Sequence, residues 1–205
     1  MVSYDSLNDL QKDVMREIGN IGAGNACTAL SVLMGTPIDM SVPNVQLIGF
    51  DNAKELLGGE DQIVLGIRVN VTDDLEGMMI HVIQKPFAQR IINTFYEKNL
   101  ESFDALDEMD ASVLNEMANI TSGAYANSIA TLTGLFVNIA TPLQIKGSVG
   151  DIMKIPLDTF INSGEHILVV DEEFVINEEQ ISSNMILALE ADSLTKLFGK
   201  LGVPL

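Results

Sequence analysis

The chain has 205 residues, 47% of them hydrophobic, which suffices for a core in one large domain or two small ones. Its 29 Asp and Glu residues against 11 Lys and Arg give a formal charge of -18, which disfavours nucleic acid and anionic membranes and favours a protein partner with a basic patch. The single cysteine, Cys27, excludes an intrachain disulfide, and the N-terminus lacks a basic, apolar-cored signal, so we expect a cytoplasmic protein without membrane insertion.

An amphipathic helix is predicted near the N-terminus, with Ser6 as its N-cap and Asp9 three residues later. Its apolar residues recur at spacings of three and four: Leu7, Leu10, Val14, Ile18 and Ile21. Strands are then predicted over 45–50, 63–71 and 77–84, the middle one from alternating apolar residues. A second helix is expected over 86–99, because Pro86 suits a first helical turn.

The second half repeats this order of elements. A long helix is predicted first, and the acidic run Asp104–Asp110 at its entrance is interpreted as solvent-exposed residues that complement the helix dipole. The predicted elements are a helix over 107–134, strands over 143–147, 167–170 with 174–176, and 184–190, and a closing helix over 193–200.

An internal repeat explains this order. Shifting the chain by 99 positions aligns Asp13–Pro43 with Ser112–Pro142, and eight of the 31 aligned positions are identical. Farther along, Met78 matches Met185 at an offset of 107. We infer a single α+β domain built of two repeats, 1–100 and 101–205, related by pseudo-two-fold symmetry. Their long helices are expected to pack on a shared, mostly antiparallel sheet.

Each repeat carries a glutamate and an asparagine one helical turn apart. A helix advances about 100° per residue, so Asp13, Glu17 and Asn20 fall within an arc of roughly 60°. The second repeat has the same arrangement in Ser112, Glu116 and Asn119. The ordinary alternative is that these are solvated helix residues, but asparagine is a poor helix former, and its recurrence at the same offset favours a function.

The chemistry of this pair favours positioning over covalent catalysis. An amide is too weak a base to abstract a proton at neutral pH, but its carbonyl can accept from a water while its NH2 donates to an oxyanion. The neighbouring glutamate could dock on a lysine of a partner. This would be catalysis by orientation, acting on a substrate that is already activated.

The pattern D/S-x-x-x-E-x-x-N followed by a distant proline resembles the CheC/CheX/FliY family of bacterial and archaeal chemotaxis phosphatases. It is present twice, as Asp13/Glu17/Asn20/Pro43 and as Ser112/Glu116/Asn119/Pro142. Two complete motifs in a chain of this length favour the CheC branch, because CheX has one motif per chain and FliY has additional flagellar-switch segments.

The resemblance implies hydrolysis of the aspartyl phosphate of phospho-CheY, the chemotaxis response regulator. The motif Asn would orient the attacking water and the motif Glu would contact a lysine of the regulator. The implied catalytic residues are Glu17, Asn20, Glu116 and Asn119, with Asp13, Ser112, Pro43 and Pro142 at supporting positions. The receiver domain of CheY would supply Mg2+, so no cofactor is expected on this chain. CheD, a receptor deamidase, is implied as a second partner.

A non-catalytic adaptor or flagellar-switch-associated protein that binds CheY or CheD is the alternative. The amide retained in both repeats favours the enzyme, since docking alone would be served equally by an acidic residue. Because the two repeats are fused, we expect a monomer with internal pseudo-symmetry. His81, His166 and Cys27 are not spaced as a zinc motif, so no metal site is expected.

Small residues surround Asn20 in the stretch EIGNIGAGNA. A phosphate-binding loop would follow a strand, whereas a helix leads into this stretch. The second repeat has Ala118, Thr121 and Gly123 at the three glycine positions. We therefore expect a helix, kinked or straight, whose small residues let a partner or the paired helix approach closely.

Overall fold

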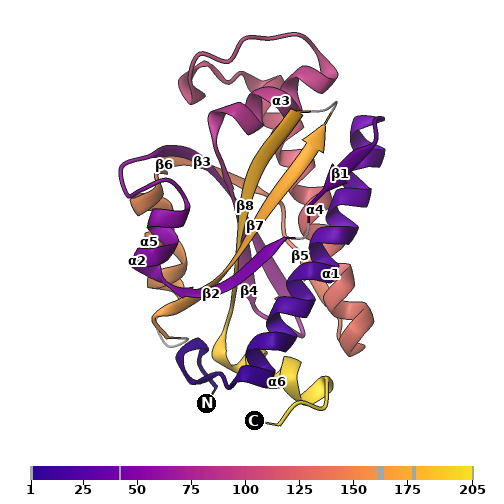
Figure 1. Cartoon of the computed structure of the whole chain (residues 1–205), viewed down its shortest axis with the longest axis vertical. Coiled ribbons are helices and arrows are strands. Elements are labelled where there is room, and N and C mark those ends of the chain that lie inside the picture. Colours follow the sequence, from indigo (N-terminus) through magenta and orange to yellow (C-terminus); the bar gives the residue numbers. More distant parts are fainter. Residues whose placement is uncertain (1, 42, 161–163, 177–178, 205) are drawn as a thin grey trace.

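The computed structural model describes residues 2–41, 43–160, 164–176 and 179–204. One order of elements occurs twice (Figure 1), which confirms a duplicated α+β fold. The first copy comprises η1 (Tyr4–Ser6), α1 (Asp9–Met34), β1 (Ile38–Met40), β2 (Asn44–Gly49), α2 (Phe50–Leu56), β3 (Ile63–Asp73), β4 (Gly77–Ile83) and α3 (Lys85–Phe95). The second comprises η2 (Phe103–Ala105), α4 (Glu108–Thr133), β5 (Val137–Ile139), β6 (Leu143–Ser148), α5 (Val149–Thr159), β7 (His166–Ile176), β8 (Glu179–Leu189) and α6 (Ala191–Lys200).

The strands form one antiparallel sheet in the order β1-β7-β8-β4-β3-β5, with β2 following β1 along β7 and β6 following β5 along β3. The short strands of each copy thus pair with a long strand of the other copy. In register, Asn44 lies opposite Asp171, and Ser148 lies opposite Ile63. The two halves of the chain are interlocked through this exchange of strands.

Helices cover both faces of the sheet (Figure 1). α1 and α4 lie on one face, over two apolar clusters, and α2 and α5 lie on the other face, over a third. The strand predicted over 63–71 is confirmed, and four of its five alternating apolar residues are buried: Leu65, Ile67, Val69 and Val71. The alternation fails at the start of the strand, where Ile63 is 54% exposed and Val64 is buried. Val64 is buried because α5 packs against the face of β3 that carries it, so both faces of this strand are covered over part of its length.

The prediction of Ser6 as the N-cap of α1 is wrong, because Ser6 belongs to η1 and Leu7 connects the two helices in an extended conformation. Asn8 caps α1 instead. Its side chain accepts from the Gln11 amide at 3.0 Å, and the Gln11 side chain accepts from the Asn8 amide at 3.0 Å. The register places Leu10 outside the core, with 54% of its surface exposed.

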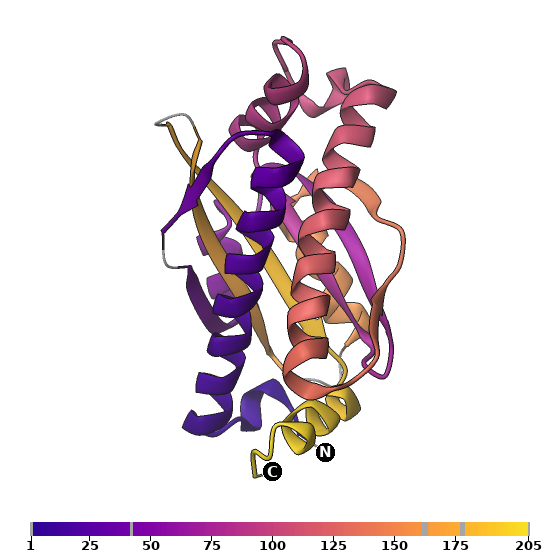
Figure 2. The same cartoon turned by 90° about the vertical axis from the view of Figure 1, so that its right-hand side faces the viewer.

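α1 runs without interruption through its glycines, beside α4 and in the opposite direction (Figure 2). A Cβ at Gly19 would lie 2.8 Å from the Val45 side chain, and one at Gly22 would lie 2.1 Å from the Tyr125 ring. A Cβ at Gly24 would meet nothing within 4 Å. Two of the three glycines therefore admit β2 and the paired helix, and only Gly24 faces open space.

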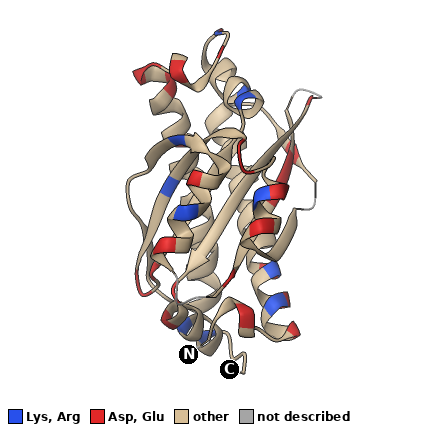
Figure 3. Cartoon of the chain, turned by 90° about the vertical axis from the view of Figure 1, so that its left-hand side faces the viewer, with Lys and Arg blue, Asp and Glu red and all other residues tan. Residues whose placement is uncertain are grey.

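Charged residues are interspersed on the side of the molecule drawn in Figure 3, where Asp and Glu are spread over several elements among Lys and Arg. On α2 and α5, Lys54 pairs with Asp51 at 3.3 Å and Lys154 with Asp151 at 3.0 Å.

Within the described residues, no helix combines the length and the apolar character that crossing a bilayer requires.

Candidate functional site

The second motif lies in an open groove of about 590 Å³ between α4 and the segment that joins β5 to β6. The lining residues are Glu108, Ala111, Ser112, Asn115, Glu116, Asn119, Ile139, Ala140, Thr141 and Pro142. The structure thus brings together all four residues that the sequence pattern assigned to the second motif: Ser112, Glu116, Asn119 and Pro142.

Strand exchange fixes the wall of this groove. β5 and β6 pair with β3 of the other copy, and the Ala140 amide donates to the Asn70 carbonyl at 2.9 Å. Gln144 then ties the wall to α4, because its Nε2 donates to the Ala111 carbonyl at 2.8 Å. Pro142 is held opposite the motif face of α4 by contacts that involve both halves of the chain.

The first motif occupies the corresponding face of α1. Asp13 and Glu17 are exposed and Asn20 is half-buried, while Pro43 directly precedes β2. Here the first motif position is engaged, since Arg16 Nη1 donates to Asp13 Oδ1 at 2.6 Å. Ser112 stands where the first copy has Asp13, so the two copies differ at this position.

The motif Glu and Asn side chains are unengaged within the part of the chain that the structure describes. None of them forms a hydrogen bond or an ion pair there: Glu17, Asn20, Glu116 and Asn119. Polar groups at a solvent-accessible face without internal partners keep their full bonding capacity for a ligand or a water. No group of three or more His, Cys, Asp or Glu side chains in the described ranges is arranged to hold a metal ion.

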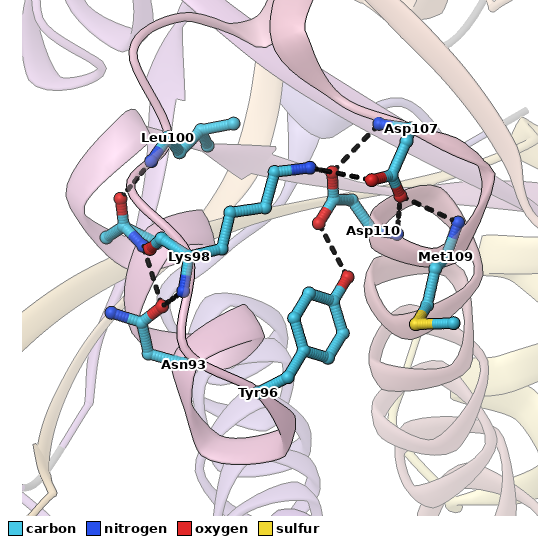
Figure 4. A network of polar contacts seen from close by, with 8 residues as sticks. Asn93, Tyr96, Lys98, Leu100, Asp107, Met109 and Asp110 are labelled. Carbon is cyan, nitrogen blue, oxygen red and sulfur yellow. Dashed lines mark hydrogen bonds and ion pairs between the residues drawn. The ribbon is translucent and has the colours of Figure 1, made fainter.

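A polar network fixes the entrance of α4, one turn before the second motif (Figure 4). Asp107 caps the helix by accepting from the amides of Met109 and Asp110. Lys98 forms ion pairs with both Asp107 and Asp110, and the Tyr96 hydroxyl donates to Asp110 at 2.6 Å. The interpretation of this acidic run as solvent-exposed is wrong for Asp110, whose side chain is fully buried because Lys98 and Tyr96 cover it.

The same network shifts the pKa of several of its groups. The hydrogen bond from Lys98 lowers the pKa of Asp107 to about 2, and the two carboxylates raise the pKa of Lys98. Desolvation, followed by the bond to Asp110, raises the pKa of Tyr96 to about 12. The ion pairs therefore persist across the physiological pH range, and the motif helix begins at a fixed position.

The connection from α3 to α4 is itself held by amide side chains. Asn93 Oδ1 accepts from the Lys98 amide at 3.1 Å, and Gln89 Oε1 accepts from the Leu100 amide at 2.5 Å (Figure 4). These bonds position Lys98 over the carboxylates. No sequence pattern pointed to Gln89, Asn93 or Lys98, although Asp107 and Asp110 have the spacing of a capping box.

Buried polar groups lie behind the two motif helices and outside the groove. The Tyr125 hydroxyl donates to Glu172 Oε1 at 2.8 Å, and burial raises the pKa of Glu172 to about 7. His81 Nε2 lies 2.8 Å from Ser122 Oγ, and burial lowers the pKa of His81 to about 4. At neutral pH His81 is therefore predominantly neutral and Glu172 is partly neutral, as expected for titratable groups in an apolar core.

The sequence matches the model of the CheC-like family over residues 10–47 and 109–143, two segments that contain both complete motifs. It is 31% identical over 209 residues to the CheY-P phosphatase CheC of Bacillus subtilis, and the alignment covers 100% of each chain.

Solved structures share the fold. The FliY crystal structure from Thermotoga maritima superimposes with a TM-score of 0.69 at 26% identity, covering 96% of this chain and 98% of that one. The CheX chain in a CheX-CheY-BeF3-Mg complex from Borrelia burgdorferi gives a TM-score of 0.55 at 19% identity, covering 82% and 95%. The architecture is therefore one that occurs in chemotaxis and flagellar proteins.

Proposed function

The chain belongs to the CheC-like family, and from that premise we propose that it is a phosphatase that hydrolyses the aspartyl phosphate of the chemotaxis response regulator CheY. Similarity over the full length to a protein named as a CheY-P phosphatase supports this activity. The observation that carries the proposal is the second groove, in which Glu116 and Asn119 lie together without partners among the described residues.

Asn119 would orient the attacking water. Its carbonyl accepts a hydrogen bond from the water while its NH2 donates to a phosphoryl oxygen, which aligns the water with the phosphorus–oxygen bond that breaks. Asn20 would do the same in the first copy. No general base on this chain is needed, because the aspartate carboxylate of the receiver is a good leaving group and the released phosphate takes up the proton of the attacking water.

Glu116 and Glu17 would dock on a lysine of the receiver domain. Both carboxylates are exposed and have no ion-pair partner in the described part of the chain, so each offers a charge that a lysine ammonium can approach. The receiver would bring its own Mg2+, which neutralises charge on the phosphoryl oxygens. The chain thus supplies orientation and docking, and the receiver supplies the phosphoryl group and the metal.

One site in each repeat, 1–100 and 101–205, follows from this proposal, with Asp13, Pro43, Ser112 and Pro142 as supporting residues. We further propose CheD as a second partner, a monomer as the working unit and the cytoplasm as the place of action. These three proposals rest on the family, the fused repeats and the composition of the chain.

The test measures phosphate release from phosphorylated CheY with and without the chain. The fourfold variant Glu17→Ala/Asn20→Ala/Glu116→Ala/Asn119→Ala should return the rate to that of CheY alone. Asn127→Ala, an exposed asparagine of α4 outside the groove, is the matched control and should leave the rate unchanged. If the fourfold variant accelerated phosphate release as much as the unsubstituted chain, the assignment of these four residues would be wrong. If the unsubstituted chain bound CheY without accelerating phosphate release, it would be a non-catalytic adaptor.

A further inference from the structure

A second asparagine, Asn115, lies in the groove beside the proposed catalytic pair. It belongs to the lining together with Ser112 and Asn119, and it directly precedes Glu116 in α4. The D/S-x-x-x-E-x-x-N pattern assigns no role to this position. Asparagine disfavours a helix interior, so its presence there needs an explanation.

The Asn115 side chain is not satisfied within the protein. Its Oδ1 atom is buried and has no hydrogen-bond partner among the described residues. The other buried side-chain atom in this state is Arg90 Nε, but that guanidinium is held through its remaining nitrogens by the Ile176 carbonyl and Glu179. Asn115 alone of the two has no such compensation, and a buried acceptor without a partner costs stability.

The fold does not require an asparagine at this position. The equivalent residue of the first copy, 99 positions earlier, is Arg16, whose guanidinium is engaged by Asp13. The two copies nevertheless form the same long helix. An unsatisfied amide that the scaffold does not need is therefore best explained by a ligand that enters the groove.

The chemistry of the groove selects the kind of ligand. Its lining includes two carboxylates, Glu108 and Glu116, and no Lys or Arg, so a free anion such as phosphate finds no cation there. Ser112 and Thr141 add hydroxyl groups that both donate and accept. An amide presents one donor edge and one acceptor edge, which matches the N–H and C=O of a peptide main chain.

We propose that Asn115 binds the main chain of the receiver loop that docks in the second groove, with its amide turning about the terminal side-chain torsion to pair with a backbone group. This inference rests on the proposed function, since the receiver is its ligand. It makes Asn115 a binding residue of the second site alone. The first site, with the Asp13–Arg16 ion pair, would hold the same partner through different contacts.

The test uses the full chain with the first site disabled by Glu17→Ala/Asn20→Ala. In this background, Asn115→Ala should raise KM for phosphorylated receiver about threefold to tenfold, the effect of one lost hydrogen bond, while kcat stays within about twofold. Asn115→Asp, which keeps the shape but adds a charge, should raise KM further. Asn127→Ala is the control that should change neither constant. The melting temperature of Asn115→Ala should not fall, because alanine favours the helix.

A binding measurement separates this inference from the proposed function. The probe is receiver loaded with Mg2+ and beryllofluoride, titrated by calorimetry, and Asn115→Ala should weaken its Kd by the same factor as KM. If hydrolysis fails but Kd still depends on Asn115, the proposed function falls and the inference stands. If hydrolysis depends on Asn119 but Asn115→Ala leaves KM and Kd unchanged, the inference is overturned. Absence of any binding overturns both.

Discussion

Gly22 of α1 and Tyr125 of α4 are in direct contact where the two motif helices pass each other. A Cβ at Gly22 would lie 2.1 Å from the Tyr125 ring, and the hydroxyl of that ring donates to buried Glu172. The ring is thus held at both ends, by a glycine backbone and by a strand of the sheet. This contact limits how closely the two motif helices can approach each other here.

Gly22→Ala should destabilise the protein. The added methyl group collides with a ring that the bond to Glu172 keeps in place, and overpacking of this kind typically costs about 1–3 kcal/mol. Gly24→Ala, two residues away in open space, should raise the free energy of unfolding by up to about 1 kcal/mol through helix propensity. Urea denaturation of the two variants measures both. Equal effects would contradict the contact described here.

Glu172 and His81 should give opposite pH dependences of the free energy of unfolding. Glu172 has a pKa of about 7 in the folded state against an ordinary 4.5, so the unfolded state ionises first as pH rises. Neutral Glu172 therefore contributes on the order of 3 kcal/mol to the free energy of unfolding below about pH 4.5, and this contribution is lost as the pH rises to about 7. His81, with a pKa of about 4 against 6.5, loses a similar amount as pH falls from about 6.5 to 4.

The Glu172→Gln variant should reveal the contribution of His81. A glutamine can still accept from the Tyr125 hydroxyl but does not titrate, so the free energy of unfolding should rise between about pH 4 and 6.5 instead of staying nearly level. Urea denaturation at several pH values between about 4 and 8 gives the profile. A variant profile that coincides with that of the unsubstituted chain would mean that Glu172 is already ionised in the folded protein.

Asn119 and Glu116 should affect different kinetic constants when the first site is disabled. Asn119→Ala should lower kcat by about 10²-fold to 10³-fold, the range for removal of one transition-state hydrogen bond. Glu116→Ala should chiefly raise KM, by about fivefold or less, because it removes one exposed ion pair. Steady-state phosphate release over a range of phosphorylated CheY concentrations separates the two. A Glu116 effect confined to kcat would argue against a docking role.

Separated halves of the chain should not fold alone. Residues 1–100 lack β7, on which β1 and β2 pair, and residues 101–205 lack β3, on which β5 and β6 pair. Circular dichroism should show little structure in either fragment and a gain of structure on mixing. The control is the full chain cut at a protease site introduced near residue 100, which should stay folded. A stably folded single fragment would contradict the interlocking.

Local sequence signals predicted the long helix of the second half to within one residue. Its ends are determined by neighbouring residues, with Asp107 capping the start and Gly134, at φ 70°, ending it. α2 and α5 were not predicted. Phe50 continued an apolar run that is typical of a strand, and only the need to cover the second face of the sheet makes 50–56 a helix.

The candidate site, too, could be predicted from the sequence only where it depends on neighbouring residues. The spacing of Glu116 and Asn119 sufficed to place them on one side of a helix. The groove opposite them could not be found by spacing, because it depends on β5 and β6 pairing with a strand far away in the sequence. The burial of Asp110 is likewise non-local, since Lys98 approaches from the preceding connection.

The exchange of short strands constrains how this protein can change over evolutionary time. Replacing a few side chains on α1 or α4 would suffice to retune or silence one site, with little cost to the scaffold. Deleting the half that carries a silenced site would remove the pairing partners of the surviving half's own edge strands. A lineage can therefore let its two sites diverge in chemistry, but it must inherit both halves together.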